Sequence, residues 1–282
     1  VLMNRFLISF TILLLFVSAC HNASEDRRDV IATDSVCVDS SCYAQDTLQL
    51  FEEEVLPESA DELFNDFFFN YTYDMNFKSQ RQAYSLDCNM GDTVVKIHSS
   101  ELDVYSELLV DDYYSIIYER DEDLAFQKDT SLNEVAVERI DLDGKQIEQY
   151  IFNRIEGKWM LTGVGRNDMG FNPNSDFLDF YKNFSSDSIY RRNSVSEPLK
   201  FVLLSEIDDV EDEIQELTSD EWLAISADLP LPAGVMINID YGQTIISKNS
   251  KLLLVEGVSN GLSLTYRFMK IEGAWNLVEV VL

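Results

Sequence analysis

The sequence reads FNDFFFNYTYD at residues 64–74 and FLDFYKNFSSD at residues 177–187. Phe, Asp, Phe, Asn and Asp recur at the same places in both stretches. In the first stretch the apolar residues have the three- and four-residue spacing of one helix face. Each stretch therefore predicts an amphipathic helix, and their recurrence predicts an internal duplication of the chain.

A second block recurs further along each copy. YIFNRIEGKWML at residues 150–161 parallels YRFMKIEGAWNL at residues 266–277. A Glu-Gly pair between two runs of strand-forming residues is typical of a hairpin turn. Asp143-Gly144 and Asn260-Gly261, which precede these blocks, are signals for type I′ turns. Each copy is therefore expected to end in an antiparallel meander.

The remaining elements follow from local pattern. Three strands are expected to close each copy, over residues 134–140, 146–155 and 159–164 in the first and 251–258, 262–271 and 275–281 in the second. A strand is also expected after each long helix, at Gln82–Leu86 and Leu199–Leu204. The capping box Thr218-Ser219-Asp220-Glu221 predicts a short helix through Ile225, with a counterpart at Asp111–Tyr118.

Further helical features are expected around these elements. The spacing of Ile207, Val210, Ile214 and Leu217 predicts an amphipathic helical turn before the capping box. The long helices are expected to be capped by side chains at their starts. The candidates are Ser59 or Asp61 for the first helix and Ser175 or Asp176 for the second.

These elements predict an α+β architecture in two tandem modules, residues 59–165 and 174–282. In each module a helix packs on a curved antiparallel sheet, and about a hundred residues are enough to bury one core. Residues 166–174 are expected to link the modules.

The recurring motifs also carry a family resemblance. The Phe-x-Asp-Phe helix with its Asn and Asp, the strand starts Ser85-Leu86 and Pro198-Leu199, and the Glu-Gly-x-Trp hairpin look like an uncharacterised family of bacterial lipoproteins. The resemblance covers Ala60 to Leu282 and implies a cystatin-like fold of the nuclear-transport-factor-two (NTF2) kind. It lends no catalytic residue to this chain.

The N-terminal residues predict export and a lipid anchor. Arg5 precedes an apolar run, residues 6–17, that is too short to span a membrane and is typical of a secretory signal. The run ends in Val17-Ser18-Ala19-Cys20, which resembles the lipobox of bacterial lipoproteins. That resemblance implies removal of residues 1–19 and attachment of palmitate-type lipid to Cys20, so that the membrane is a partner. An ordinary signal peptide is the alternative.

Residues 20–58 are acidic, lack a sustained apolar period and predict a flexible tether. Ala23-Ser24-Glu25-Asp26 resembles an acidic signal for the outer cell surface, so we expect an outer-membrane or surface location, with a periplasm-facing protein as the alternative. Cys37 and Cys42 are spaced for a small disulfide loop, with a metal pair as the rival. Cys88 is then left as a free thiol, with His98 as its candidate base.

The net charge of −30 at pH 7 argues against nucleic acid as a partner, because the chain repels a phosphate backbone. It permits basic proteins, cations or an uncharged envelope glycan. Glycine-rich phosphate loops, paired metal histidines and Gly-x-Ser-x-Gly elbows are missing from the sequence. No cofactor or metal site is therefore expected.

Several residues remain candidates for chemistry. The repeated acids Asp66, Asp74, Asp179 and Asp187 have a structural interpretation at helix ends and a second one as general bases. Asn70 and Asn183 recur beside them. The acids of residues 206–221 and of residues 141–144 are interpreted as a solvated helix face and a hairpin turn rather than as calcium ligands.

We expect a non-enzymatic binding or scaffolding module at the cell envelope, without a catalytic residue. Two other classes stay open. One is an enzyme that uses a carboxylate in a module cavity. The other is a surface protein that binds glycan or peptide through the pocket aromatics Tyr114 and Trp222. The sequence does not identify the ligand, the membrane leaflet, the oligomeric state or the fate of Cys88.

Overall fold

The computed structural model describes residues 61–90, 93–99, 108, 112–205, 211–245 and 247–282. The predicted signal peptide, the tether, Cys20, Cys37 and Cys42 lie outside the described residues. The described residues belong to one compact unit. Within the described ranges, no helix has the length and apolar character needed to cross a membrane.

The first half of the described chain contains two helices, six strands and two 3₁₀ segments. In chain order these are α2 (Phe64–Tyr73), α3 (Met75–Gln80), β1 (Gln82–Met90), β2 (Thr93–His98), β3 (Tyr113–Tyr118), η3 (Asp121–Lys128), β4 (Glu134–Asp141), β5 (Gln146–Ile155), β6 (Lys158–Asp168) and η4 (Met169–Phe171). The meander β4–β6 confirms the strands predicted there.

The second half has nearly the same order of elements. They are α4 (Ser175–Ser186), α5 (Ser188–Asn193), β7 (Val195–Leu203), β8 (Glu213–Leu217), α6 (Ser219–Ile225), β9 (Val235–Asp240), β10 (Ser250–Gly257), β11 (Ser263–Ile271) and β12 (Ala274–Val281). The predicted capping box is present at the start of α6, where Thr218 accepts a hydrogen bond from the Glu221 N–H.

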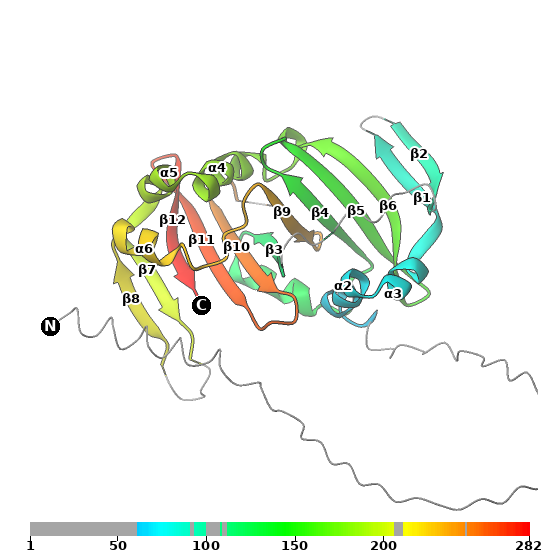
Figure 1. Ribbon diagram of the computed structural model, residues 1–282, viewed down its shortest axis with the longest axis horizontal. Helices are drawn as coiled ribbons and strands as arrows, with labels where there is room; N and C mark the ends of the chain where they lie inside the picture. The colour runs from blue at the N-terminus through cyan, green and yellow to red at the C-terminus, as the bar shows by residue number, and fades with distance from the viewer. Residues whose placement is uncertain (1–60, 91–92, 100–107, 109–111, 206–210, 246) are drawn as a thin grey trace, which may run out of the picture. The chain divides into compact units, whose positions relative to one another are not determined.

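The strands of the described residues all join one twelve-stranded sheet, in the order β2-β1-β6-β5-β4-β9-β3-β10-β11-β12-β7-β8. Figure 1 shows β9 and β3 at the middle of this row, between β4 and β10. The two middle strands have exchanged sides. β3 precedes β4 in the chain but pairs with β10, whereas β9 precedes β10 but pairs with β4. Each half of the sheet therefore contains a strand from the other half of the chain.

The exchanged strands form full antiparallel ladders with their new neighbours but hardly pair with each other. β3 and β10 pair from Tyr113↔Gly257 to Tyr118↔Leu252, and β9 and β4 pair along all of β9. Between β3 and β9, which run parallel, the only residue pair in the described register is Ser115↔Asn238.

Side chains replace the missing backbone bonds at this β3–β9 seam. The Asn238 Oδ1 accepts the Ile117 N–H at 3.1 Å, and the Asn238 Nδ2 donates to Glu138 Oε2 of β4 at 2.9 Å. The Ser115 hydroxyl donates to the Ile237 carbonyl at 2.7 Å. Because Ser115 and Asn238 are 0% and 2% exposed, losing these bonds would leave buried polar groups unpaired.

A buried ion pair fixes the end of β3 to β10. Lys251 Nζ lies 2.7 Å from Glu119 Oε1, and the two side chains are 4% and 3% exposed. The second carboxylate oxygen of Glu119 accepts the Ser247 N–H at 2.6 Å. A buried charge without its partner is strongly destabilising. Pairing of β3 with β10 in another register would separate Glu119 from Lys251 and is therefore unfavourable.

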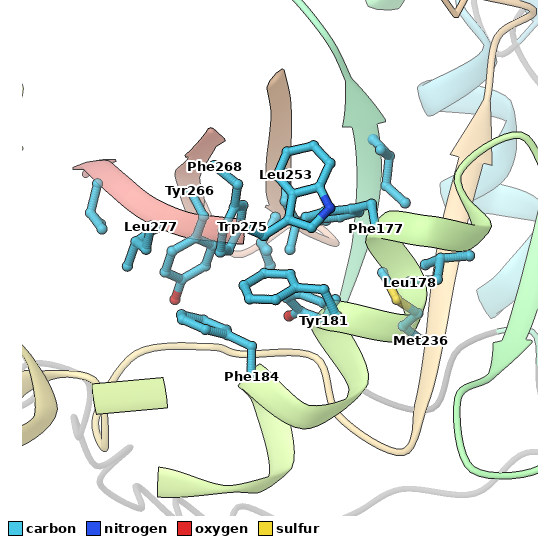
Figure 2. Close-up of a cluster of buried hydrophobic side chains, with 14 of the residues drawn as sticks. Phe177, Leu178, Tyr181, Phe184, Met236, Leu253, Tyr266, Phe268, Trp275 and Leu277 are labelled. Carbon is cyan, nitrogen blue, oxygen red and sulfur yellow. The ribbon is translucent and has the colours of Figure 1, made fainter. Parts of the chain in front are cut away.

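Two hydrophobic cores form on opposite faces of the sheet. Along β10, Leu253 and Val255 belong to the core under α4, whereas Leu252 and Leu254 belong to the core under α2. Successive strand residues point to opposite faces, so both faces of β10 are buried. Figure 2 shows the α4 core, with Phe177 and Tyr181 from the helix packed near Phe268 and Trp275 of the sheet.

The predicted caps Asp61, Ser175 and Asp176 were wrong, since Leu63 and Asn174 occupy the cap positions of α2 and α4 without a side-chain cap bond. Ser59, the other candidate, lies outside the described residues. The acids instead fix each helix start to a hairpin tryptophan. Asp61 accepts the backbone N–H of Trp159 at 2.9 Å, and Asp176 accepts the indole N–H of Trp275 at 3.0 Å.

Other predicted elements also differ. The expected short helix at residues 111–118 is wrong, because Tyr113–Tyr118 forms strand β3, and Ile214 and Leu217 lie in strand β8 rather than in a helical turn. Both segments are built into the sheet, and this pairing overrides a weak helical period. The expected linker is ordered, since β6 extends to Asp168 and η4 follows directly.

The seam gives a first prediction. Asn238→Ala removes both bonds of the Asn238 side chain and leaves the Ile117 N–H and the Glu138 carboxylate without this partner. We expect the free energy of unfolding, measured by urea denaturation, to fall by about 2–4 kcal/mol.

Asn249→Ala is the matched control, because Asn249 is exposed. This variant should stay within about 0.5 kcal/mol of the wild type. If both substitutions lowered the free energy of unfolding by the same amount, the seam bonds would add no more to stability than an exposed asparagine does.

Candidate functional site

A cavity of about 330 Å³ lies where the end of β6 and the following segment meet β4, β5 and β9. This Glu138 cavity is named after its most buried acid. It is lined by Glu138, Ile147, Gln149, Asn167, Asp168, Phe171, Asn172, Pro173, Asn174, Asp240 and Ile245. Its volume suits a small metabolite rather than a polymer segment.

Glu138 is the buried centre of this lining. It is only 2% exposed, and the other buried residues of its strand, Val135, Val137 and Ile140, are all apolar. Its Oε1 accepts hydrogen bonds from Gln149 Nε2 at 2.9 Å and Asn172 Nδ2 at 3.1 Å. With the bond from Asn238 to Oε2, three carboxamides surround one carboxylate.

Burial raises the pKa of the Glu138 carboxyl above its usual range, because the charged form loses its hydration. The hydrogen bonds from Gln149, Asn238 and Asn172 act against this shift, while the nearby charge of Asp240 adds to it. The net direction is upward, so Glu138 holds its proton to a higher pH than an exposed glutamate does.

Asp240 is the second acid of the cavity and ends strand β9. Its Oδ1 accepts the Gly242 N–H at 2.8 Å, and burial raises the pKa of its carboxyl as well. Glu138 lies on β4 and Asp240 on β9, and the strand exchange makes these two strands neighbours. The site therefore depends on the strand exchange.

More carboxamides extend the polar lining. Asn167 Nδ2 donates to Gln149 Oε1 at 3.3 Å, and Asn172 Oδ1 accepts the Asn174 N–H at 2.8 Å. Asn174 is 8% exposed, and its own Oδ1 is buried without a hydrogen-bond donor among the described residues. Among the described residues this enclosed acceptor stays unpaired, which costs free energy.

Phe171 supplies an apolar surface at the rim. Its side chain is 86% exposed, the largest exposed fraction recorded for a large apolar residue in the described chain. It lies in η4, whose N-cap Asp168 accepts the Gly170 N–H at 2.7 Å. Asp168 and Phe171 belong to the segment expected to be a linker, which instead forms one wall of the cavity.

The arrangement is chemically suited to hold hydrogen-bond donors. A protonated Glu138 could also exchange a proton with a ligand, as a general acid or base does. However, both oxygens of Glu138 already accept amide hydrogens, and Asn238 ties the carboxylate to the seam. These bonds fix its position and limit its freedom to reach a substrate proton.

The repeated acids lie elsewhere. Asp74 and Asp187 cap α3 and α5, each accepting two backbone N–H groups. Asp179 pairs with Lys145 at 2.6 Å on the surface, and Asp66 is exposed. The two recurrent asparagines donate to backbone carbonyls one helical turn earlier, as Asn70 to Asp66 and Asn183 to Asp179. The structural interpretation accounts for all of these contacts.

The two pocket aromatics are not brought together. Trp222 is fully enclosed in the α4 core, with its ring 6.1 Å from that of Tyr266. Tyr114 is 6% exposed and packs on Phe68 in the other core. In this conformation neither ring presents a face to a ligand from solution.

Cys88 and His98 lie on neighbouring strands but not opposite each other. Cys88 is buried in β1, forms no disulfide within the described residues and lies opposite Val95, whereas His98 lies opposite Ser85. In the part of the chain that the structure describes, no three acids, histidines or cysteines gather as a metal site would require. Glu206 and the next four residues of the acidic run lie outside that part.

Sequence reasoning missed Glu138 and Asp240. Glu138 falls within a predicted strand and is followed directly by Arg139, and a charged pair of this kind usually marks solvent-facing positions. Asp240 ends a strand, β9, that was not expected. The available signal was the run Val235–Ile239, which is apolar except for Asn238; it predicts a strand buried on both faces and would have placed Asp240 at its end.

Glu138 predicts a specific pH dependence. A carboxyl whose pKa is higher in the folded than in the unfolded state destabilises the fold progressively as pH rises through that interval. Urea unfolding between about pH 4 and pH 8 should show the wild type losing stability relative to Glu138→Gln as pH rises.

Glu134→Gln on the same strand is the matched control. Glu134 is exposed, so the difference between the two variants isolates the effect of burial. A constant free-energy difference between wild type and Glu138→Gln across the pH range would contradict the account.

Comparisons with known proteins agree with the fold. A solved structure described as an NTF2-like protein, from Bacteroides fragilis NCTC 9343, matches with a TM-score of 0.70 and 31% sequence identity. The match covers 80% of this chain and 98% of that one, which supports the expected NTF2-like, α+β fold. A search of curated proteins gives no match. The family described as "Domain of unknown function (DUF4348)" matches residues 44–281, so this chain belongs to the DUF4348 family.

Proposed function

We propose that this protein is a cell-envelope lipoprotein whose folded domain binds a small polar ligand in the Glu138 cavity. The observation that carries the proposal is the cavity itself. It has a volume of about 330 Å³ and a lining of carboxylates and carboxamides with an exposed phenylalanine at its rim. Most small-molecule sites are concave and fix their ligand through a few convergent polar groups.

Binding accounts for this lining better than catalysis does. A general base must reach the proton it removes at hydrogen-bond distance. Glu138 is held by Gln149, Asn172 and Asn238, and its link to the seam gives it a structural role. The domain therefore acts as a non-enzymatic binding module.

An enzyme that uses a carboxylate in the cavity is the second candidate. The raised pKa values of Glu138 and Asp240 favour it, because perturbed carboxyl groups in a cavity are typical of acid–base sites. Asp240 is the more accessible of the two. Turnover of a bound compound would distinguish this candidate from simple binding.

The N-terminal segment supports the anchoring part of the proposal. Removal of residues 1–19 would leave lipid-bearing Cys20 at the start of the acidic tether, residues 20–58, in which Cys37 and Cys42 are spaced for a disulfide. The protein would then be held at the outer membrane or cell surface, or face the periplasm. A glycan or peptide of the envelope remains an alternative ligand to a free small molecule.

We further propose that residues 59–165 and 174–282 descend from one duplicated module. The recurring sequence blocks and the similar order of elements support this origin. Glu156-Gly157 and Glu272-Gly273 also adopt nearly the same backbone, with φ values of 51° and 83° against 52° and 84°. In this view, the two modules exchanged the strands β3 and β9.

The anchor is tested by metabolic labelling with an alkyne analogue of palmitate. We expect the wild type to be labelled and to sediment with membranes. Cys20→Ala should lose both properties, because the thiol that receives the lipid is gone.

Cys37→Ala is the matched control and should be labelled like the wild type. Full labelling of the Cys20→Ala protein would refute the anchor, and so would selective loss of label from Cys37→Ala.

The cavity is tested by saturation-transfer NMR on the full chain in detergent. The mixture contains cationic, neutral and anionic molecules below about 200 Da. Some should bind, and Phe171→Ala should weaken their binding about two- to tenfold, because an aromatic contact contributes about 0.5–1.5 kcal/mol.

Ile189→Ala serves as the control, because Ile189 is 72% exposed and does not line the cavity. The proposal fails if no compound binds, or if the two substitutions affect binding equally. Conversion of a bound compound into a product would favour the enzyme instead.

A further inference from the structure

We infer that the Glu138 cavity selects a small organic cation, one that carries an amine or guanidinium group. This inference rests on the proposed binding function and specifies its ligand class. It is drawn from the charge of the lining, from carboxylates that only accept hydrogen bonds, and from the ring at the rim.

The charge of the lining is negative. Glu138, Asp168 and Asp240 contribute three carboxyl groups, whereas the described lining includes no lysine, arginine or histidine. The whole chain adds a net charge of −30, which attracts cations and repels anions over a longer range. An anionic ligand would meet like charges here without a compensating partner.

The carboxamides of the lining use part of their hydrogen-bonding capacity on Glu138 and on one another. The Gln149 and Asn172 amides each donate to Glu138, and the Asn167 amide donates to Gln149. Each of these amides keeps a second N–H, so the amides alone do not select between ligand classes. The ionised carboxylates of the lining can only accept hydrogen bonds, and they therefore favour a ligand with several N–H groups.

Asp240 is the residue best placed to pair with a cation. The hydrogen bond recorded for its carboxylate comes from one backbone N–H, that of Gly242, and goes to Oδ1 alone. Asp240 is less buried than Glu138, so its carboxylate is also easier for a ligand to reach. A charge-assisted hydrogen bond from an ammonium or guanidinium group is stronger than one from a hydroxyl.

Phe171 adds a second interaction suited to a cation. The face of an aromatic ring attracts ammonium and guanidinium groups within about 6 Å of its centroid. At 86% exposure the ring is free to cover a ligand at the cavity rim. A metal ion fits less well, because no metal-binding group of acids, histidines and cysteines is found in the described ranges.

Three probes with the same five-carbon chain test the ligand class. They are 1,5-diaminopentane, 1,5-pentanediol and glutarate, which differ in charge but hardly in length. Calorimetric titration of the full chain in detergent should show the diamine binding at least tenfold more tightly than the diol. Glutarate should not bind.

Asp240→Asn tests the site. The asparagine oxygen can still accept the Gly242 N–H, so the turn is preserved, and thermal unfolding checks that the variant is folded. We expect its affinity for the diamine to fall at least tenfold. Asp228→Asn removes an exposed carboxylate outside the lining and should leave the affinity within twofold of the wild type.

The outcomes separate the two proposals. Binding of the diol or glutarate at least as tightly as the diamine, weakened by Phe171→Ala, would overturn the cation inference and keep the binding function. Equal loss of diamine binding in Asp240→Asn and Asp228→Asn would show nonspecific attraction and also overturn the inference. If no probe binds, the inference fails, and the wider mixture decides whether the cavity binds anything.

Discussion

The seam between β3 and β9 is the constraint on which the rest of this structure depends. Two parallel strands meet there with a single described residue pair, and the side chains of Ser115 and Asn238 supply the missing hydrogen bonds. These buried groups are satisfied only in this register, because a shift would leave them unpaired. The seam therefore fixes both exchanged strands, and through them the two cores on opposite faces of the sheet.

The same seam connects the fold to the cavity. Asn238 contacts the backbone of β3 with its oxygen and the Glu138 carboxylate with its nitrogen. Glu138 consequently supports the sheet and lines the cavity at once. Asp240 reaches the cavity only because its strand lies beside β4. A chain that paired β3 with β4 would not bring these two acids together.

Local features of the fold were predictable from the sequence. The helices over Phe64–Tyr73 and Ser175–Ser186, the meander strands and the capping box at Thr218 follow from periodicity and turn residues close to them in the chain. The exchange of β3 and β9 was not predictable, because it pairs residues about a hundred or more positions apart. A helix was expected over Asp111–Tyr118, but such pairing makes Tyr113–Tyr118 a strand.

The candidate site was predictable only in outline. A buried carboxylate in a cavity was one expectation, but the acids proposed for it were those that recur between the two copies. Recurrence selects residues that both halves need for folding, such as the capping acids Asp74 and Asp187. The cavity is lined by Glu138, Asp240 and Phe171 instead, and one of its walls is the segment that was expected to be a linker.

Native-state hydrogen exchange tests the central claim most directly, namely that the exchanged strands join both halves into one cooperative unit. The backbone amides of β5 and β11 would be followed at increasing denaturant concentration. We predict that both strands open with the same free energy, equal to that of global unfolding. Exchange of one strand at a clearly lower free energy, while the other stays protected, would show independent halves and contradict this account.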